Sequence, residues 1–290
     1  MTQEAEFRRK LGLRIDANKL AMRDNVYAPV HREILAWLEI APGAHVLDAG
    51  CGAGGVTVLL AETVGAGGSV AAVDIAPTLL ATTRARVEAT PYASRVTYHE
   101  NDIASLPFAN SQFDLVWCSR VIHDLPDQLA SLRELFRVLK PGGRIALREQ
   151  VARPHLLPFD VGLGRPGLED RVNLAYSYRF VEYRRSLPDV KEYALGWLAL
   201  LREAGFGDVT AHSFLLEMTP PFTEQQHAYL LDLLRAPLEL PRMKRRLDPK
   251  DEQTLTRLTD PEGPFYVFNR SDLHYVSVST VYVGYARKGR

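Results

Sequence analysis

The segment Val46–Gly55, V-L-D-A-G-C-G-A-G-G, most constrains what this 290-residue chain can fold into. Four glycines follow an apolar run and directly precede V-T-V-L-L-A-E-T-V, a helix-like segment. Glycine lets the backbone turn tightly and approach a ligand closely, and a helix N-terminus offers free N–H groups and a partial positive charge. The segment therefore predicts a buried strand, a tight loop and a helix that begins beside a ligand.

Strand-like and helix-like segments alternate from about Ala28 to Val151. Short apolar runs predict strands at residues 45–49, 69–74, 95–102, 113–119 and 144–151. Helical spacing of apolar residues predicts helices at residues 28–40, 56–64, 78–90 and 128–140. Such alternation implies an α/β fold with a doubly wound, mostly parallel sheet.

The alternation fails after Val151 and returns only in part. Residues 152–190 have weak periodicity, and a long irregular stretch in a compact enzyme is usually functional or flexible. A helix is expected at 193–205, strands at 208–218 and 274–286, and a mostly helical insertion at 220–272. We therefore expect one domain, residues 1–290, with seven strands of which the last is antiparallel. Its expected parts are a helical cover (1–40), a core (41–151, 195–219 and 273–288) and two substrate-side insertions (152–194 and 220–272).

Composition excludes several classes of partner. The chain has 35 basic and 35 acidic residues, so no net field favours nucleic acid or an anionic membrane. Its two cysteines, Cys51 and Cys118, show no disulfide or metal-ligand pattern, and we expect no metal. No apolar run approaches 18 residues and the N-terminus does not look like a signal peptide. We expect a cytoplasmic protein with a small-molecule ligand; its oligomeric state is left open.

The glycine loop admits more than one ligand. Gly50, Gly52 and Gly55 satisfy G-x-G-x-x-G, which is typical of nicotinamide dinucleotide sites but also fits a tight turn with no ligand. Asp48 argues against a dinucleotide, because a carboxylate at the loop entrance repels a pyrophosphate but can hold an ammonium group or a water. The run through Asp48 and Gly54 is then D-x-G-x-G-x-G.

At this point the sequence resembles the class I S-adenosylmethionine-dependent methyltransferases, most closely those of the ubiquinone/menaquinone-biosynthesis type. Other motifs match in the family's order: V-A-A-V-D-I-A at the second strand, N-D-I-A-S-L-P-F at 101–108, L-K-P-G-G-R, and A-G-F-G-D-V at 204–209. The resemblance implies a Rossmann-like sheet and S-adenosyl-L-methionine as cofactor. The cofactor-binding residues that it implies are Asp48, Gly50, Gly52, Gly54, Asp74, Ile75, Asp102, Ile103 and Ser119.

The roles implied for these residues are specific, and each has a simpler alternative. Asp74 would accept hydrogen bonds from the ribose hydroxyls, or would only cap the next helix. Asp102 would contact the adenine amine and Ile103 the ring, or Asp102 would be an ordinary turn aspartate. Cys51 is interpreted as a small buried filler rather than a nucleophile.

The loop after the fourth strand, S-R-V-I-H-D-L-P-D, should border the reacting methyl group, because ligands of doubly wound sheets bind beyond the carboxyl ends of the strands. His123 is a candidate general base oriented by Asp124, since imidazole accepts a proton near neutral pH. Many natural-product O-methyltransferases carry a base here, whereas in many ubiquinone-type relatives a histidine in this loop only positions other groups. Both interpretations stay open.

The acceptor pocket should be built by the divergent segments. Residues 165–191 interleave six basic residues with tyrosines and a phenylalanine, which fits either a solvated helix or a lid over an acidic or aromatic substrate. The cluster R-M-K-R-R at 242–246 is interpreted as a solvated face. We expect methyl transfer to a small molecule, most readily to oxygen, with carbon or nitrogen as the alternative. A nicotinamide-dependent dehydrogenase and a catalytically silent cofactor-binding scaffold are the alternatives from other classes.

Overall fold

The computed structural model describes residues 16–149 and 152–287. This part of the chain divides into two compact units. The first comprises the described residues up to Glu149, residues 187–214 and those from Ser279 onward; the second comprises residues 152–186 and 215–278. No helix in these ranges is both long enough and apolar enough to cross a membrane.

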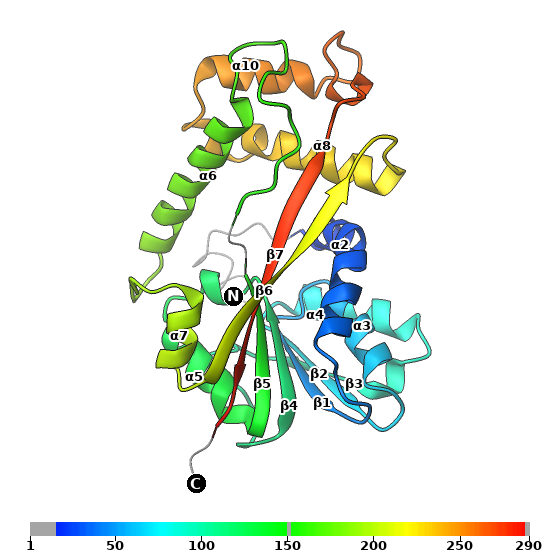
Figure 1. Cartoon of the computed structure of the whole chain (residues 1–290), viewed down its shortest axis with the longest axis vertical. Coiled ribbons are helices and arrows are strands. Elements are labelled where there is room, and N and C mark those ends of the chain that lie inside the picture. Colours follow the sequence, from blue (N-terminus) through cyan, green and yellow to red (C-terminus); the bar gives the residue numbers. More distant parts are fainter. Residues whose placement is uncertain (1–15, 150–151, 288–290) are drawn as a thin grey trace. The chain divides into compact units, whose positions relative to one another are not determined.

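A seven-stranded sheet forms the framework, in the order β3-β2-β1-β4-β5-β7-β6 (Figure 1). Neighbouring strands from β3 to β5 are parallel, and β7 is antiparallel to β5. The doubly wound, mostly parallel sheet with an antiparallel last strand is therefore confirmed. Its strands are β1 (His45–Ala49), β2 (Ser69–Asp74), β3 (Val96–Glu100), β4 (Phe113–Ser119), β5 (Leu139–Glu149), β6 (Gly207–Met218) and β7 (Tyr275–Tyr285).

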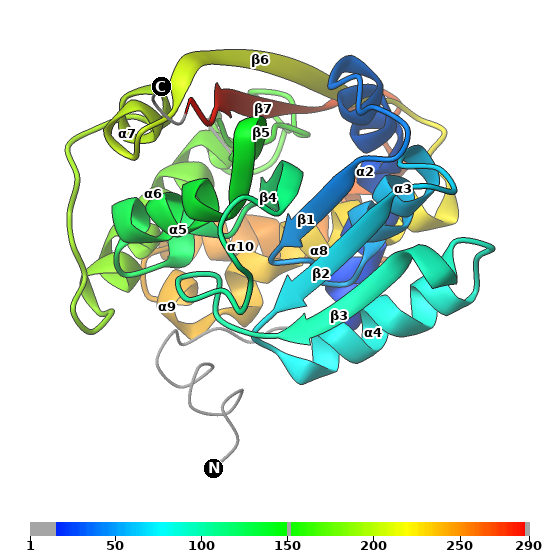
Figure 2. The same ribbon diagram turned by 90° about the horizontal axis from the view of Figure 1, so that it is seen from below.

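Helices cover both faces of the parallel strands, as the view from below shows (Figure 2). One face carries α2 (Ala17–Trp37), α3 (Gly55–Thr63) and α4 (Pro77–Glu88). The other carries α5 (Gln128–Val138) and α7 (Trp197–Glu203). The central strands read as continuous apolar runs because both of their faces are covered; in β4, for example, Trp117 and Cys118 are both fully buried.

The starts of two elements differ from the sequence-based expectation. Helix α2 begins at Ala17 rather than near Ala28, because Asp16 caps it by accepting hydrogen bonds from Asn18 N and Lys19 N. Residues 1–15 of the expected helical cover lie outside the described residues. Strand β5 begins at Leu139 and contains the Pro-Gly-Gly segment that we expected only to stop the preceding helix. The pairing of β5 with β4 shifts register between Phe113 and Leu115, so the sheet is irregular where it contains the Pro-Gly-Gly segment.

The second unit is largely helical and corresponds closely to the two expected insertions. Residues 152–190, whose periodicity is weak, contain the 18-residue helix α6 (Leu168–Arg185), in agreement with the helix interpretation of residues 165–191. The later insertion is mostly helical, as expected. Its helices are α8 (Glu224–Glu239), α9 (Pro241–Lys244) and α10 (Pro249–Leu258).

Two arginines of the basic segment 165–191 help to hold this unit together. Arg171 donates two hydrogen bonds to the carboxylate of the buried Asp251, from Nε at 2.8 Å and from Nη2 at 2.9 Å. Arg165 Nη2 donates a third to the same carboxylate at 3.0 Å. The hydrogen bond from Arg171 is the main reason why the pKa of Asp251 lies below its ordinary value. In the 242–246 cluster, Arg246 pairs with Glu182 and Lys244 with Glu252. These basic side chains therefore connect helices within the unit.

Candidate functional site

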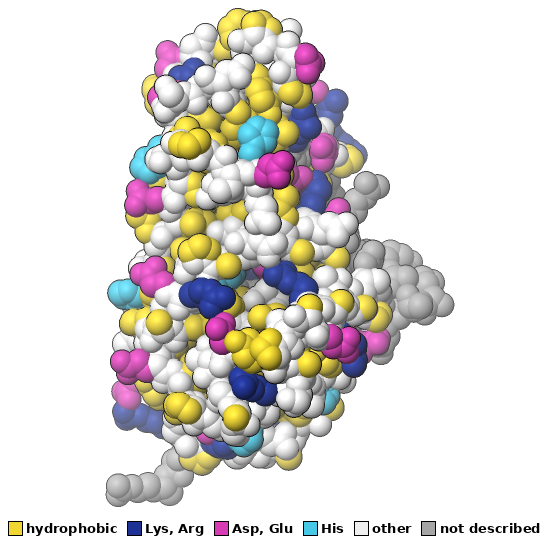
Figure 3. Space-filling view, turned by 90° about the vertical axis from the view of Figure 1, so that its right-hand side faces the viewer, with side chains coloured by type: hydrophobic (Ala, Val, Ile, Leu, Met, Phe, Trp, Pro, Cys, Tyr) yellow, Lys and Arg dark blue, Asp and Glu magenta, His cyan; other side chains and the backbone are white. Residues whose placement is uncertain are grey.

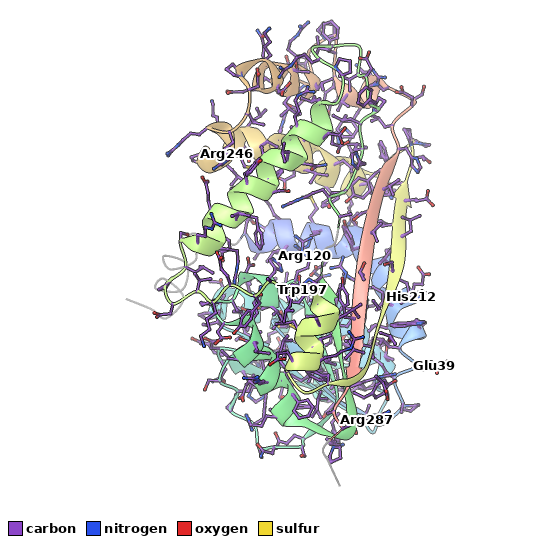
Figure 4. The ribbon with its side chains drawn as sticks, turned by 60° about the vertical axis from the view of Figure 1, so that its left-hand side comes forward. Glu39, Arg120, Trp197, His212, Arg246 and Arg287 are labelled. Atoms are coloured by element: carbon purple, nitrogen blue, oxygen red, sulfur yellow. The ribbon has the colours of Figure 1, made fainter. Side chains whose placement is uncertain are left out.

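The predicted site residues gather at the carboxyl edge of the parallel strands. Asp74 and Ser119 are the last residues of β2 and β4, and Asp48 is the penultimate residue of β1, which lies between those two strands. Arg120, which directly follows β4, is labelled in Figure 4. In doubly wound folds this edge, near the point where strand order reverses, is where ligands bind. Here the order reverses between β1 and β4.

The three predicted loop glycines all have positive φ, between +59° and +80°, but differ in their surroundings. A Cβ built on Gly50 would lie 2.3 Å from Val121 Cγ2, and one built on Gly54 would lie 2.8 Å from Thr83 Cα. A Cβ on Gly52 would meet no atom within 4 Å. Close packing of the protein itself thus requires glycine at positions 50 and 54, whereas position 52 borders open space beside the loop.

Asp48 is a buried carboxylate that accepts a hydrogen bond from one side chain among the described residues. Its side chain is 2% exposed, and Oδ2 accepts a hydrogen bond from Thr57 Oγ1 at 2.6 Å. Burial raises the pKa of Asp48 to about 7, and the nearby Asp24 and Asp74 add to that rise against the hydrogen bond from Thr57. A carboxyl in this state is suited to a cationic partner, which would stabilise its charged form.

Asp74 ties the glycine loop to the start of α4. Oδ2 accepts a hydrogen bond from Gly52 N at 2.9 Å, and Oδ1 accepts one from Ala76 N at 3.0 Å. The capping alternative is therefore present in the structure. Capping and ligand binding by Asp74 are compatible, because an ionised aspartate offers about four acceptor positions. Ile75, which follows Asp74, is half-buried.

Asp102 and Ile103 occupy the turn after β3. Asp102 is exposed, and its Oδ1 accepts a hydrogen bond from Ala104 N at 2.9 Å, which is the turn interaction considered above. Ile103 is buried in the apolar core. Asp102 thus shapes the turn through one carboxylate oxygen while its side chain stays open to solvent.

His123 lies in a short 3-10 turn, Ile122–Asp124, and its closest acidic partner is Glu149. Nδ1 of His123 lies 2.7 Å from Glu149 Oε2, whereas Nε2 lies 3.4 Å from Asp124 Oδ2. Burial by itself would lower the pKa of His123, but the charge and hydrogen bond of Glu149, with a contribution from Asp124, raise it above its ordinary value of 6.5. The imidazole is 23% exposed and the Glu149 carboxylate 2%.

Two residues at this edge were missed by the sequence-based prediction. Glu149 is the last residue of β5, which pairs with β4; an acid at the carboxyl end of a predicted strand was the available signal. Asp24 of α2 accepts a hydrogen bond from Gly55 N at 3.1 Å, at the start of α3. A carboxylate is stabilised at a helix N-terminus, but nothing in the sequence links α2 to that position.

The described residues fit an S-adenosylmethionine-type ligand. Position 52 leaves room for a ligand beside the loop backbone, and Asp48 is a buried carboxyl suited to an ammonium group. Asp74 at the end of β2 and Asp102 in the turn after β3 offer acceptors for hydroxyl and amine donors. This set of acceptors, with a carboxyl at the loop entrance, suits that ligand better than a pyrophosphate.

The comparisons with known proteins agree with this chemistry. A family model described as "Methyltransferase domain" matches residues 47–147. The demethylmenaquinone methyltransferase of Symbiobacterium thermophilum is 37% identical over 143 residues, 48% of this chain and 56% of that protein. That of Bacillus pumilus is 31% identical over 61% of this chain and 76% of the relative. The ubiquinone/menaquinone biosynthesis C-methyltransferase UbiE of Paracoccus denitrificans is 33% identical over 65% and 78%.

The chain spans only about half the length of the first of these relatives, whereas it covers three quarters or more of the other two. Among solved structures, the YcgJ protein from Bacillus subtilis has a TM-score of 0.54 at 19% identity, with 89% of this chain and 99% of that chain covered. A candidate methyltransferase from Bacillus halodurans gives 0.53 at 21%, with 88% and 98% covered. These likenesses confirm the fold. The chain therefore belongs to the class I S-adenosylmethionine-dependent methyltransferases, in the group of the ubiquinone/menaquinone-biosynthesis type.

Proposed function

We propose that this chain transfers a methyl group from S-adenosylmethionine to a small molecule that carries a hydroxyl group on a conjugated ring or an enol. The sulfonium of S-adenosylmethionine supplies a methyl group that is already electrophilic. The protein must therefore align the acceptor and, where the acceptor is a hydroxyl compound, remove its proton.

The pair formed by His123 and Glu149 is the observation that carries this proposal. The Glu149 carboxylate accepts the proton on Nδ1 across 2.7 Å, which leaves Nε2 as the basic nitrogen. The carboxylate also stabilises the imidazolium that forms when Nε2 takes a proton. A buried acid behind a partly exposed imidazole is the arrangement expected of a general base. We assign Glu149 as the orienting group in addition to Asp124, which lies farther away.

The relatives bear on which atom of the acceptor is methylated. Loss of a hydroxyl proton from a phenol or enol places negative charge on the oxygen and on the neighbouring carbon, so one base serves methylation at either atom. The sequence-based prediction is oxygen. The name C-methyltransferase, carried by the Paracoccus relative, supports the neighbouring carbon. We therefore propose the carbon of a quinol-type ring as the first acceptor to test, with its hydroxyl oxygen as the second.

The test uses the purified chain, S-adenosylmethionine, and a panel of phenols and quinols that includes a demethylmenaquinol. We expect mass spectrometry to show one added methyl group and NMR to place it on carbon or on oxygen. His123→Ala should lower turnover by about a hundredfold or more, with unchanged affinity for S-adenosylhomocysteine.

His45→Ala is the matched control, because His45 is exposed at the amino end of β1 and should leave turnover unchanged. If His123→Ala keeps near-normal turnover, His123 is not the base. If no member of the panel is methylated while S-adenosylhomocysteine binds, the silent-scaffold alternative gains support.

A further inference from the structure

Arg148 is a buried guanidinium at the carboxyl edge of the sheet. It is the penultimate residue of β5 and only 6% exposed. Nη1 donates to Ser119 Oγ at 3.2 Å on β4, and Nη2 donates to Ser279 Oγ at 2.7 Å on β7. A guanidinium carries five N–H donors, and these two serine hydroxyls are its only hydrogen-bond acceptors in the part of the chain that the structure describes. Nε is buried with no partner.

No acidic side chain pairs with Arg148 among the described residues. The nearby acid on the same strand, Glu149, holds His123 instead. The guanidinium also lies near the ring of Tyr27, whose centroid is 5.3 Å from the guanidinium carbon. Burial lowers the pKa of Arg148 to about 10, with smaller contributions from Arg120 and Arg23, so the group is still charged at neutral pH.

A second buried group beside Arg148 also lacks partners. His31 of α2 is 4% exposed, and neither ring nitrogen has a hydrogen-bond partner. Burial, followed by the charges of Arg148 and Arg23, holds the pKa of His31 well below its ordinary value. The neighbourhood therefore combines the unpaired positive charge of Arg148 with three buried nitrogens that make no hydrogen bond.

Such an arrangement is costly for folding alone. Burying a charge without a counter-charge is unfavourable, and replacing a buried ionic group by an apolar side chain of similar volume is often neutral or stabilising. A planar guanidinium is, in contrast, the preferred group for binding a carboxylate through parallel hydrogen bonds. A bound anion would offset the desolvation of Arg148 and use its remaining donors.

We propose that Arg148, set between Ser119 and Ser279, is the binding site for a carboxylate group of the methyl acceptor. This inference rests on the proposed function, because it assigns an acidic substrate to the same site. The structure favours the acceptor over the cofactor as the source of the carboxylate. The two serines place the guanidinium over β5, whereas the backbone of β1, which carries Asp48, lies two strands or about 10 Å away at the usual strand spacing. The ammonium and carboxylate of the cofactor share one carbon, so an ammonium paired with Asp48 would hold that carboxylate on the β1 side of the site.

The experiment compares wild type with Arg148→Met, which removes the charge at similar length, and Arg148→Lys, which keeps it. Benzoate is the anionic probe and benzamide its neutral counterpart, each titrated by calorimetry in saturating S-adenosylhomocysteine. We expect wild type to bind benzoate and not benzamide. Arg148→Met should weaken benzoate binding by about ten- to a hundredfold, as for loss of hydrogen bonds to a charged group. Arg148→Lys should lose less.

Two further measurements separate this role from others. Arg148→Met should leave the thermal midpoint unchanged or raised. The matched control Arg144→Met, on the same strand, removes contacts with the backbone oxygens of Leu38 and Glu39 and should lower the midpoint while leaving benzoate binding intact. Affinity for S-adenosylhomocysteine, and for 5′-methylthioadenosine, which lacks the amino-acid carboxylate, should be the same in wild type and Arg148→Met.

Two results would overturn the inference, and a third would bear on the proposed function alone. A lower midpoint with unchanged benzoate affinity in Arg148→Met would make Arg148 a structural residue. Weaker binding of S-adenosylhomocysteine but not of 5′-methylthioadenosine would assign the site to the cofactor carboxylate and overturn the acceptor assignment. Failure of wild type to bind S-adenosylhomocysteine would count against the proposed function alone, because benzoate titration without it still tests Arg148.

Discussion

The imidazole of His123 lies between two carboxylates in unequal environments. Glu149 is almost fully buried and lies 2.7 Å from Nδ1, whereas Asp124 is about a quarter exposed and lies 3.4 Å from Nε2. Because a buried charge is screened less than an exposed one, Glu149 dominates the rise in the pKa of His123 against the lowering effect of burial. The raised pKa means that the base form of His123 is reached at higher pH than that of an ordinary histidine.

This raised pKa gives a pH prediction for catalysis. The neutral imidazole is the active form of a general base, so turnover should rise with pH and its midpoint should lie above 6.5. Glu149→Gln removes the charge that raises the pKa, so the midpoint should move to lower pH while the maximal turnover falls. The measurement is the pH dependence of kcat for both forms. An unmoved midpoint would mean that the titrating group is not His123.

Asp48 combines a structural cost with a predicted ligand-binding role. Its pKa is raised from 3.8 to about 7 by burial. Since the folded state holds a proton that the unfolded state releases above pH 4, the cost of burying Asp48 is small at pH 4 and fully present above pH 7. At about 1.4 kcal/mol for each pKa unit, that cost reaches about 4 kcal/mol.

Asp48→Asn should therefore stabilise the protein at pH 8 and have little effect on stability at pH 4. The same change should weaken S-adenosylhomocysteine binding, because the amide cannot pair with the ligand ammonium. In wild type, affinity should increase from pH 6 to pH 8 as Asp48 ionises, and in Asp48→Asn it should be flat. Thermal unfolding and calorimetry at the stated pH values test both parts. A loss of stability at pH 8 would show that the Asp48 charge is not costly in the fold.

At the scale of elements, the glycine loop between β1 and α3 contains two kinds of glycine. Both Gly52 and Gly54 have positive φ, +59° and +80°, so any other residue is strained there by about 1 kcal/mol. Only Gly54 also packs tightly, since its Cβ would overlap the backbone of Thr83 in α4. Glycine at position 54 is therefore needed for packing of the fold, whereas glycine at position 52 would be needed for a ligand.

The pair of variants Gly52→Ala and Gly54→Ala tests this separation. Gly54→Ala should lower the free energy of unfolding by about 1–3 kcal/mol more than Gly52→Ala, because it overpacks the α3–α4 contact. Gly52→Ala should fold but bind S-adenosylhomocysteine at least about tenfold more weakly, as its methyl group enters the open space. Equal binding by Gly52→Ala and wild type would place the ligand elsewhere.

The same scale explains what the sequence could predict. Strands such as β4 and helices such as α5 were identifiable because their burial follows a simple period on a doubly covered sheet. Helix α6 matches the solvated-helix interpretation of residues 165–191, but its period is blurred: Val172 and Ala175 are buried, while Leu174 and Tyr178 are exposed. Its apolar residues do not mark one face, so the local pattern could not decide between a solvated helix and a lid.

The candidate site was predictable only where it is local in sequence. The glycine loop and Asp74 belong to short motifs that can be read directly from the chain. The contact between His123 and Glu149 spans 26 residues and exists because β4 and β5 pair in parallel. The contact between Arg148 and Ser279 spans 131 residues and needs the antiparallel return of β7 beside β5. Such contacts follow from register, which the sequence alone does not determine.

At the scale of the whole molecule, basic and acidic residues are equal in number, and the predicted cofactor residues lie in one of the two compact units. On the face shown in Figure 3, basic and acidic side chains are interspersed, as expected for a chain with 35 of each sign. The predicted cofactor residues, from Asp48 to Ser119, all belong to the first compact unit. The second unit contains none of them, so it should respond to the cofactor product differently from the first.

Hydrogen exchange with and without S-adenosylhomocysteine tests this division. At a ligand concentration of a hundred times Kd, the bound state is stabilised by about 2.7 kcal/mol, which is enough to slow exchange that proceeds through opening of the ligand site. Protection should concentrate at residues 50–58, 74–80 and 102–106, where the loop and two strand ends would face the ligand. Helices α8 and α10 should change less, because no predicted cofactor residue lies in them.

NAD serves as the matched ligand in the same experiment, since it shares the adenosine group but adds a pyrophosphate. We expect no protection by NAD, because a pyrophosphate at the loop would meet the carboxylates of Asp48 and Asp74 at neutral to alkaline pH. Protection of the glycine loop by NAD but not by S-adenosylhomocysteine would support the dehydrogenase alternative. Equal protection by both would show that the loop recognises only adenosine, and would remove Asp48 from the determinants of specificity.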